Sequence, residues 1–159
     1  MPIRFRWASK EYFPIALMFL GVCGLFQVLF TYIGQYFLAV GNYIAIILIP
    51  IGITIALFFG TIIIFEAYAQ VERKRVLKTQ FSKKTTTISK LRKILLFPII
   101  RPIIITFPVF TVLFFISFPI SRVLLNNTVS FIVSENIGAI ACLLVANMIE
   151  KNYARIQRY

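Results

Sequence analysis

The sequence predicts an all-α integral membrane protein, a bundle of four transmembrane helices arranged as two helical hairpins with both termini in the cytoplasm. Three observations lead to this fold class. Sixty per cent of the residues are apolar and only 14% are charged, whereas about a quarter of an ordinary globular chain is charged. Four long stretches carry almost no charge, and the 17 Lys and Arg residues cluster outside them. Residues 1–159 are therefore treated as a single transmembrane domain.

Each of the four apolar runs is long enough to cross a bilayer as one helix, because the hydrocarbon core is about 30 Å thick and needs about 20 helical residues. The second run, Tyr36–Phe65, is long for one span and too short for two, so tilt or a protruding end is expected. No run alternates apolar and polar residues as a membrane strand would. The predicted spans are approximately 12–33, 37–67, 98–121 and 128–149.

The breaks between the runs predict the topology. Gly34-Gln35 separates the first two runs and residues 122–128 separate the last two, so each pair is expected to form a helical hairpin. Between the pairs lies a basic segment, residues 70–93, with nine Lys and Arg and one acid. Cations also flank both ends of the chain, and cytoplasmic segments are the ones that carry Lys and Arg in excess. An arrangement of four spans places the three cation-rich segments, which are the two chain ends and residues 70–93, together in the cytoplasm.

The basic segment and the start of the third run predict contacts with lipid headgroups. Cations beside a membrane are attracted to anionic lipids by about 1 kcal/mol each. If the third span begins at Pro102, Arg101 is interfacial and residues 89–101 lie along the membrane surface; if it begins at Ile94, Arg101 lies about 10 Å inside. We favour the interfacial position, from which an Arg side chain can reach the headgroups. The predicted lipid contacts are Lys90, Arg92, Lys93 and Arg101.

The residue types exclude several classes of function. The chain has no His and its five acids are all Glu, so His-based zinc sites, imidazole-ligated haem and Ser-His-Asp triads are excluded. We expect no enzyme activity, no cofactor and no metal. The basic segment has a single aromatic residue, Phe81, on which a base would stack, so nucleic acid is not an expected partner.

Small residues recur at every fourth position in two of the runs. This spacing places them on one face of a helix, where another backbone can come close. We interpret both sets as packing faces within the bundle, with an interface to another membrane protein as the alternative. The residues are Gly52, Ala56 and Gly60 in the second run, and Gly138, Cys142 and Ala146 in the fourth.

Glu135 is the one charge inside an apolar run. If the fourth helix starts at Asn127, Glu135 lies about 12 Å along it, on the face of Gly138. A charge at that depth costs at least a few kcal/mol and is expected to face the bundle. We predict that Glu135 pairs with Arg122, or is protonated and hydrogen-bonded inside the bundle. Glu135, Asn136 and Arg122 are the candidate binding residues.

Two functions fit these features. The first is a non-enzymatic membrane protein acting through intramembrane contacts with another membrane protein or a second copy, as an accessory or assembly subunit or an immunity-type protein that blocks a pore. The second is a small transporter or channel that uses Glu135 as a proton or ligand site. A bacterial inner membrane is the favoured location. The Asn126-Asn127-Thr128 sequon leaves an ER-type membrane open.

Overall fold

The computed structural model describes residues 13–80 and 99–156, which form four long α-helices: α1 (Phe13–Tyr36), α2 (Tyr43–Gln80), α4 (Ile100–Arg122) and α5 (Asn127–Ile156). Four stretches within them are long and apolar enough to span a membrane: Phe13–Tyr36, Tyr43–Ala69, Ile100–Arg122 and Asn127–Asn152. The prediction of an all-helical, multi-pass membrane protein is confirmed.

Two boundaries differ from the predicted ones. Helix α1 continues through Gly34 to Tyr36, and the first reversal falls at residues 37–42. There the Asn42 side-chain oxygen accepts hydrogen bonds from the backbone N–H groups of Ile44 and Ala45, which caps the start of α2. At its other end α2 is helical to Gln80. The first eleven residues of the predicted basic loop 70–93 are therefore helical, and residues 81–93 lie outside the described part of the chain.

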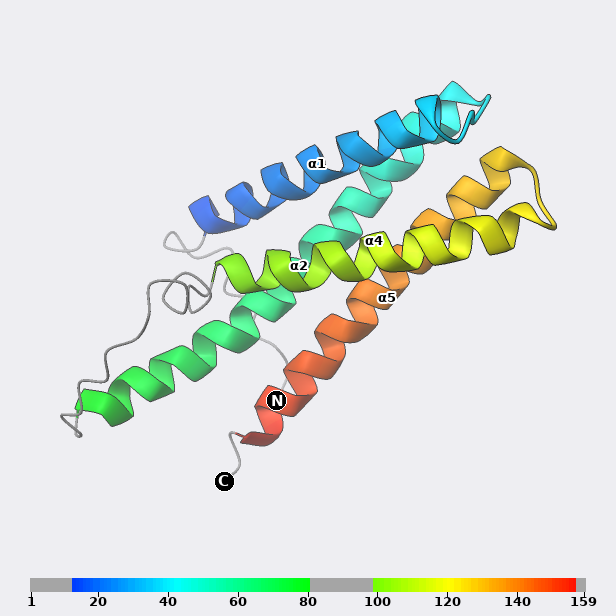
Figure 1. Ribbon diagram of the computed structural model, residues 1–159. Coiled ribbons are helices and arrows are strands. Elements are labelled where there is room, and N and C mark those ends of the chain that lie inside the picture. The colour runs from blue at the N-terminus through cyan, green and yellow to red at the C-terminus, as the bar shows by residue number, and fades with distance from the viewer. Residues whose placement is uncertain (1–12, 81–98, 157–159) are drawn as a thin grey trace.

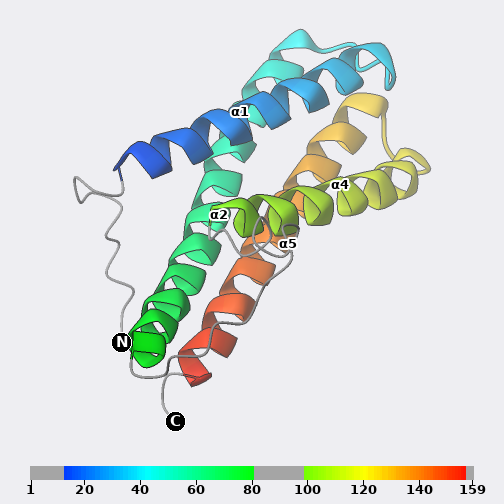
Figure 2. The same cartoon turned by 60° about the vertical axis from the view of Figure 1, so that its left-hand side comes forward.

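The helices form two crossing layers. Figures 1 and 2 show α2 and α5 side by side, with α1 and α4 crossing over them. The connections at 37–42 and 123–126 lie at one end of the molecule, called the turn end below (Figure 1). The last residues of α1 and the first residues of α5 both lie at this end, so the two helices run in opposite senses (Figure 2).

Phenylalanine rings pack between α1, α4 and α5. The Phe30 ring of α1 lies 5.0 Å from that of Phe110 and 4.9 Å from that of Phe114, both on α4, measured between centroids. Phe114 in turn meets Phe131 of α5 edge to face at 5.9 Å. Offset and edge-to-face ring pairs contribute about 0.5–1.5 kcal/mol each beyond the area they bury. Three helices are thus held together by one set of rings.

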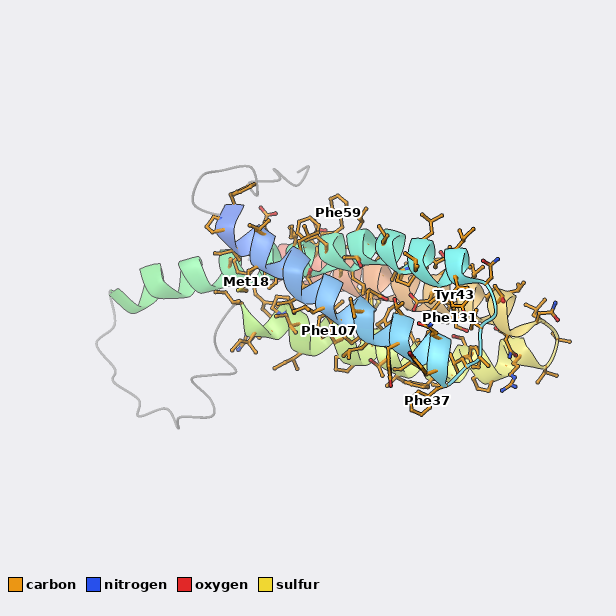
Figure 3. The ribbon with its side chains drawn as sticks, turned by 90° about the horizontal axis from the view of Figure 1, so that it is seen from above. Met18, Phe37, Tyr43, Phe59, Phe107 and Phe131 are labelled. Atoms are coloured by element: carbon orange, nitrogen blue, oxygen red, sulfur yellow. The ribbon has the colours of Figure 1, made fainter. Side chains whose placement is uncertain are left out.

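Two glycines make room for these rings. A Cβ atom on Gly34 would lie 2.8 Å from a ring carbon of Phe131, and one on Gly138 would lie 2.9 Å from a ring carbon of Phe110. Both distances are shorter than real carbon contacts. Figure 3 shows Phe131 near the end of the bundle that carries Phe37 and Tyr43, and Phe107 nearer the opposite end. Gly34 lies within α1 and does not form the predicted break. Its missing side chain makes room for the ring of Phe131.

The outer faces of the helices are apolar. Large side chains such as Leu25, Ile44, Ile120 and Ile140 are exposed, as expected for side chains that contact lipid. A soluble protein rarely exposes apolar surface on this scale.

Replacing either ring-accommodating glycine with alanine is expected to destabilise the bundle. Gly34→Ala and Gly138→Ala each force a buried phenylalanine to move, at a cost of about 1–3 kcal/mol. Gly52→Ala is the matched control, because Gly52 is exposed and a Cβ there meets no atom within 4 Å. Thermal unfolding in detergent, followed through the reactivity of the buried thiols of Cys23 and Cys142, measures the effect. Equal unfolding temperatures for all three variants would contradict this packing.

Candidate functional site: a buried polar pair

Glu135 lies deep inside the bundle on α5. It is eight residues from the start of the helix at Asn127, or about 12 Å along it, and its side chain is 0% exposed. Neither carboxyl oxygen has a hydrogen-bond partner. Gly138, Cys142 and Ala146 are buried on the same helix. The structure thus places Glu135 on an inward-facing side of α5.

A second buried polar side chain, Gln27 of α1, is 2% exposed. Neither its amide nitrogen nor its amide oxygen has a hydrogen-bond partner. Sequence reasoning missed this residue because it is uncharged and lies in an otherwise apolar run. The available signal was its helical spacing from Cys23 and Phe30, since all three are buried.

The two side chains lie at similar depth in the bundle. Gly34 and Phe131 are in contact near the turn end. Gln27 is seven residues from Gly34 and Glu135 is four residues from Phe131, about 10 Å and about 6 Å by helical rise. Because α1 and α5 run in opposite senses, both displacements point away from the turn end. The Cα atoms of Gln27 and Glu135 therefore differ in depth by about one helical turn or less.

The buried hydroxyl groups of the bundle donate to backbone carbonyls three to five residues earlier in the chain. Ser134 donates to the carbonyl of Ser130 at 2.7 Å, and Thr106 to that of Pro102 at 2.7 Å. A hydroxyl that donates in this way keeps its oxygen lone pairs as acceptors. Among the described residues, every buried hydroxyl has a backbone acceptor of this kind: Thr61, Thr106, Ser117, Ser130 and Ser134.

The two thiols have partners on neighbouring helices. Cys142 donates to the backbone oxygen of Thr106 at 3.4 Å. Cys23 lies 3.9 Å from the hydroxyl oxygen of Thr61, whose own hydrogen is engaged by α2 carbonyls. Both cysteines are free and buried. Within the described part of the bundle, no group of three His, Cys, Asp or Glu side chains is placed to hold a metal ion.

The predicted ion pair with Arg122 is not formed. Arg122 is the last residue of α4 and is exposed at the turn end, while both oxygens of Glu135 are unpartnered. The carboxyl is about two helical turns along α5, whereas the guanidinium stays where water and headgroups solvate it. The prediction correctly placed Glu135 on an inward face but was wrong about its partner. The predicted internal hydrogen bond of Glu135 is also absent.

Asn136 points away from Glu135. It is exposed on the outer face of α5, and its amide nitrogen donates to the carbonyl of Ile132 at 2.7 Å. Adjacent residues on a helix project about 100° apart, which explains the separation. The three candidate binding residues therefore do not form one site.

The predicted packing residues of α2 have different surroundings. Gly60 is buried, and a Cβ there would lie 3.8 Å from a side-chain carbon of Leu143. Ala56 is half-buried, but Gly52 is exposed with open space around it. Gly52 therefore does not pack against another described helix, which corrects the prediction of an internal contact there.

Arg101 lies in the first turn of α4 and is half-buried. Its guanidinium carbon is 5.2 Å from the ring centroid of Tyr68 on α2, a cation–π distance. The other predicted lipid contacts, Lys90, Arg92 and Lys93, lie outside the described residues.

Comparison with known proteins does not add to this assignment, since no family model, curated protein or solved structure matches the chain. The chemistry of the site therefore comes from its own residues. A carboxyl and a carboxamide without partners are costly to bury, by about 1–3 kcal/mol per unsatisfied group and more for a charge. A bundle that needed only stability would hold apolar side chains in both places.

Removing the unpartnered amide is expected to stabilise the protein. Gln27→Met keeps a side chain of similar length and removes two buried polar atoms, so the free energy of unfolding should rise by about 1–2 kcal/mol. Thermal unfolding in a buffer with choline as the added cation measures the change. Gln35→Met, an exposed position on the same helix, should have little effect. A loss of stability in Gln27→Met would show that the amide makes a bond on which the bundle depends.

Proposed function

We propose that the chain is a small, non-enzymatic membrane transporter or channel in which Glu135 is the proton or ligand site. The observation that carries the proposal is a fully buried carboxyl with no partner on either oxygen. Ionisable side chains within membrane spans are rare and usually lie on substrate or proton pathways. A carboxyl that binds and releases a transported ion or proton must have no permanent partner, and the Glu135 carboxyl meets this condition.

A structural role explains Glu135 less well. An ion pair with Arg122 would have fixed the α4–α5 connection, but that pair is not formed. A residue that binds a partner protein would need to reach the outer surface, and Glu135 is 0% exposed. A ligand that enters the bundle accounts for both facts.

Buried polar side chains inside the bundle support a pathway toward the site. All four helices contribute buried polar side chains, from Gln27 on α1, Thr61 on α2 and Thr106 on α4 to Ser134 on α5. Prolines inside α2 and α4 (Pro50, Pro108 and Pro119) leave backbone carbonyls without their helical donors. Such positions let a membrane helix bend where neighbours compensate. The proposed pathway runs along this interior.

The proposed orientation is two hairpins with both termini and the basic segment in the cytoplasm of a bacterial inner membrane. Support comes from the sequence rule that cytoplasmic segments carry excess cations. Arg101 and Lys151 flank the ends of α4 and α5 that face away from the turn end, where anionic headgroups are the proposed neighbours.

A second candidate function, contact with another membrane protein, is favoured by Asn136. An exposed carboxamide about 13 Å along a spanning helix is costly against lipid and is usually hydrogen-bonded to another helix. A second copy is the partner we propose. Copies inserted with the same orientation and related by a two-fold axis normal to the membrane place the same residue at the same depth. A carboxamide both donates and accepts, so it can pair with itself.

Flux measurements distinguish the two functions. Purified protein in liposomes loaded with a pH-sensitive dye, with an imposed proton or sodium gradient, should conduct in the wild type and lose at least nine-tenths of the flux in Glu135→Gln. Glu150→Gln, on the same helix but near its far end, is the matched control and should retain flux. Wild-type liposomes no leakier than protein-free ones would refute transport of these ions. A dimer of two chains without flux, dissociated by Asn136→Leu, would favour the second candidate.

A further inference from the structure

The ligand class follows from the charges inside the bundle. Glu135 is the only charged side chain that is buried among the described residues. One carboxylate and one positive charge form a neutral pair, whereas a divalent ion would leave a net charge in a medium of low dielectric constant. We propose that Glu135 and Gln27 bind a single monovalent cation through oxygen atoms, either a sodium ion or a proton. This inference rests on the proposed function, in that it takes Glu135 as the ligand site.

The hydrogen-bonding groups of the interior favour a cation. The carboxyl oxygens of Glu135 and the amide oxygen of Gln27 have no donor, and the buried hydroxyls give their hydrogens to backbone carbonyls. An anion would find one unengaged side-chain donor among the buried described residues, the amide nitrogen of Gln27. Oxygen atoms are the ligands that hard cations prefer. The interior is therefore rich in acceptors and poor in donors.

The aromatic packing separates the site from water at the turn end, so a bound ion would need more than one oxygen ligand from the protein. Phe131 and Phe114 lie between the site and the turn end, and both are fully buried. An ion that these two rings separate from the turn end loses its hydration and must receive oxygen ligands from the protein. The amide oxygen of Gln27 adds a neutral ligand without changing the charge balance.

Few other titratable groups are buried in the described bundle with Glu135. The other titratable groups buried in the described bundle are the thiols of Cys23 on α1 and Cys142 on α5. Within the four apolar spans, the remaining titratable and charged groups lie toward the span ends: Tyr32, Tyr36, Tyr43, Glu66, Tyr68, Arg101, Arg122, Glu150 and Lys151. Sodium and protons therefore compete for one carboxyl.

Thermal unfolding of the purified full chain in detergent tests this inference without any transport. Sodium is titrated against choline at constant ionic strength, from pH 5 to pH 9, with thiol reactivity of Cys23 and Cys142 as the readout. If sodium binds, the unfolding temperature rises by about 5 °C at saturation. The rise is larger at pH 9 than at pH 5, because protons compete less. It disappears in Glu135→Gln, shrinks in Gln27→Met and persists in Glu150→Gln.

The proton gives a different pattern. The protonated acid is uncharged and costs less to bury, so in choline the wild type loses stability as pH rises, with no effect of sodium. In Glu135→Gln this pH dependence is reduced. Stability that responds to neither ion, or that responds equally in wild type and Glu135→Gln, overturns the inference; a sodium effect unchanged by Gln27→Met removes Gln27 from the site. Cation binding without liposome flux would refute transport alone, and flux of another solute without cation binding would refute only this inference.

Discussion

The structure depends on one constraint of the bilayer: no water is present in its core to hydrogen-bond a polar group. The helices satisfy most of their own backbone groups, and the buried hydroxyls of Thr61, Thr106, Ser117, Ser130 and Ser134 donate to backbone carbonyls nearby in the chain. Glu135 and Gln27 are not satisfied in this way, since all four of their polar side-chain atoms are buried without a partner. In a bundle where other polar side chains are accommodated locally, these two groups are best explained by a ligand.

Aromatic packing sets where that ligand would lie. The ring of Phe131 rests on Gly34 of α1, and the ring of Phe110 rests on Gly138 of α5. These contacts fix the relative depth of α1, α4 and α5, and so fix Gln27 relative to Glu135. They also close the bundle toward the turn end. Gly138 of α5 thus admits a ring. At Cys142 the sequence pattern correctly predicted the close approach of another helix, because a Cβ on Gly60 of α2 would lie 3.9 Å from the backbone oxygen of Cys142. The same contacts that stabilise the bundle isolate its polar interior.

Much of the architecture could be predicted from the sequence, because four uncharged runs of about 20 residues or more leave few alternatives. The inward direction of Glu135 was predictable from helical spacing. The absence of an Arg122–Glu135 ion pair was not predictable, since it depends on the depth of the Glu135 side chain and the solvent exposure of Arg122. The predicted break at Gly34-Gln35 was wrong, because a glycine can mark either a turn or a close contact, and only the position of Phe131 decides between the two. The burial of Gln27 was not predicted, because the residue type of an uncharged side chain in an apolar run gives no sign that it is buried and unpartnered.

The central claim is that Glu135 carries no fixed partner and exchanges one positive charge. Infrared spectroscopy tests it directly, because a protonated carboxylic acid has a carbonyl stretch that a carboxylate lacks. The difference spectrum between wild type and Glu135→Gln should show this band in choline buffer at acidic pH. Raising the pH, with sodium added, should replace it with carboxylate bands. A Glu135 signal that remains that of a carboxylate under every condition would contradict the account, because it would require a permanent cationic partner inside the bundle.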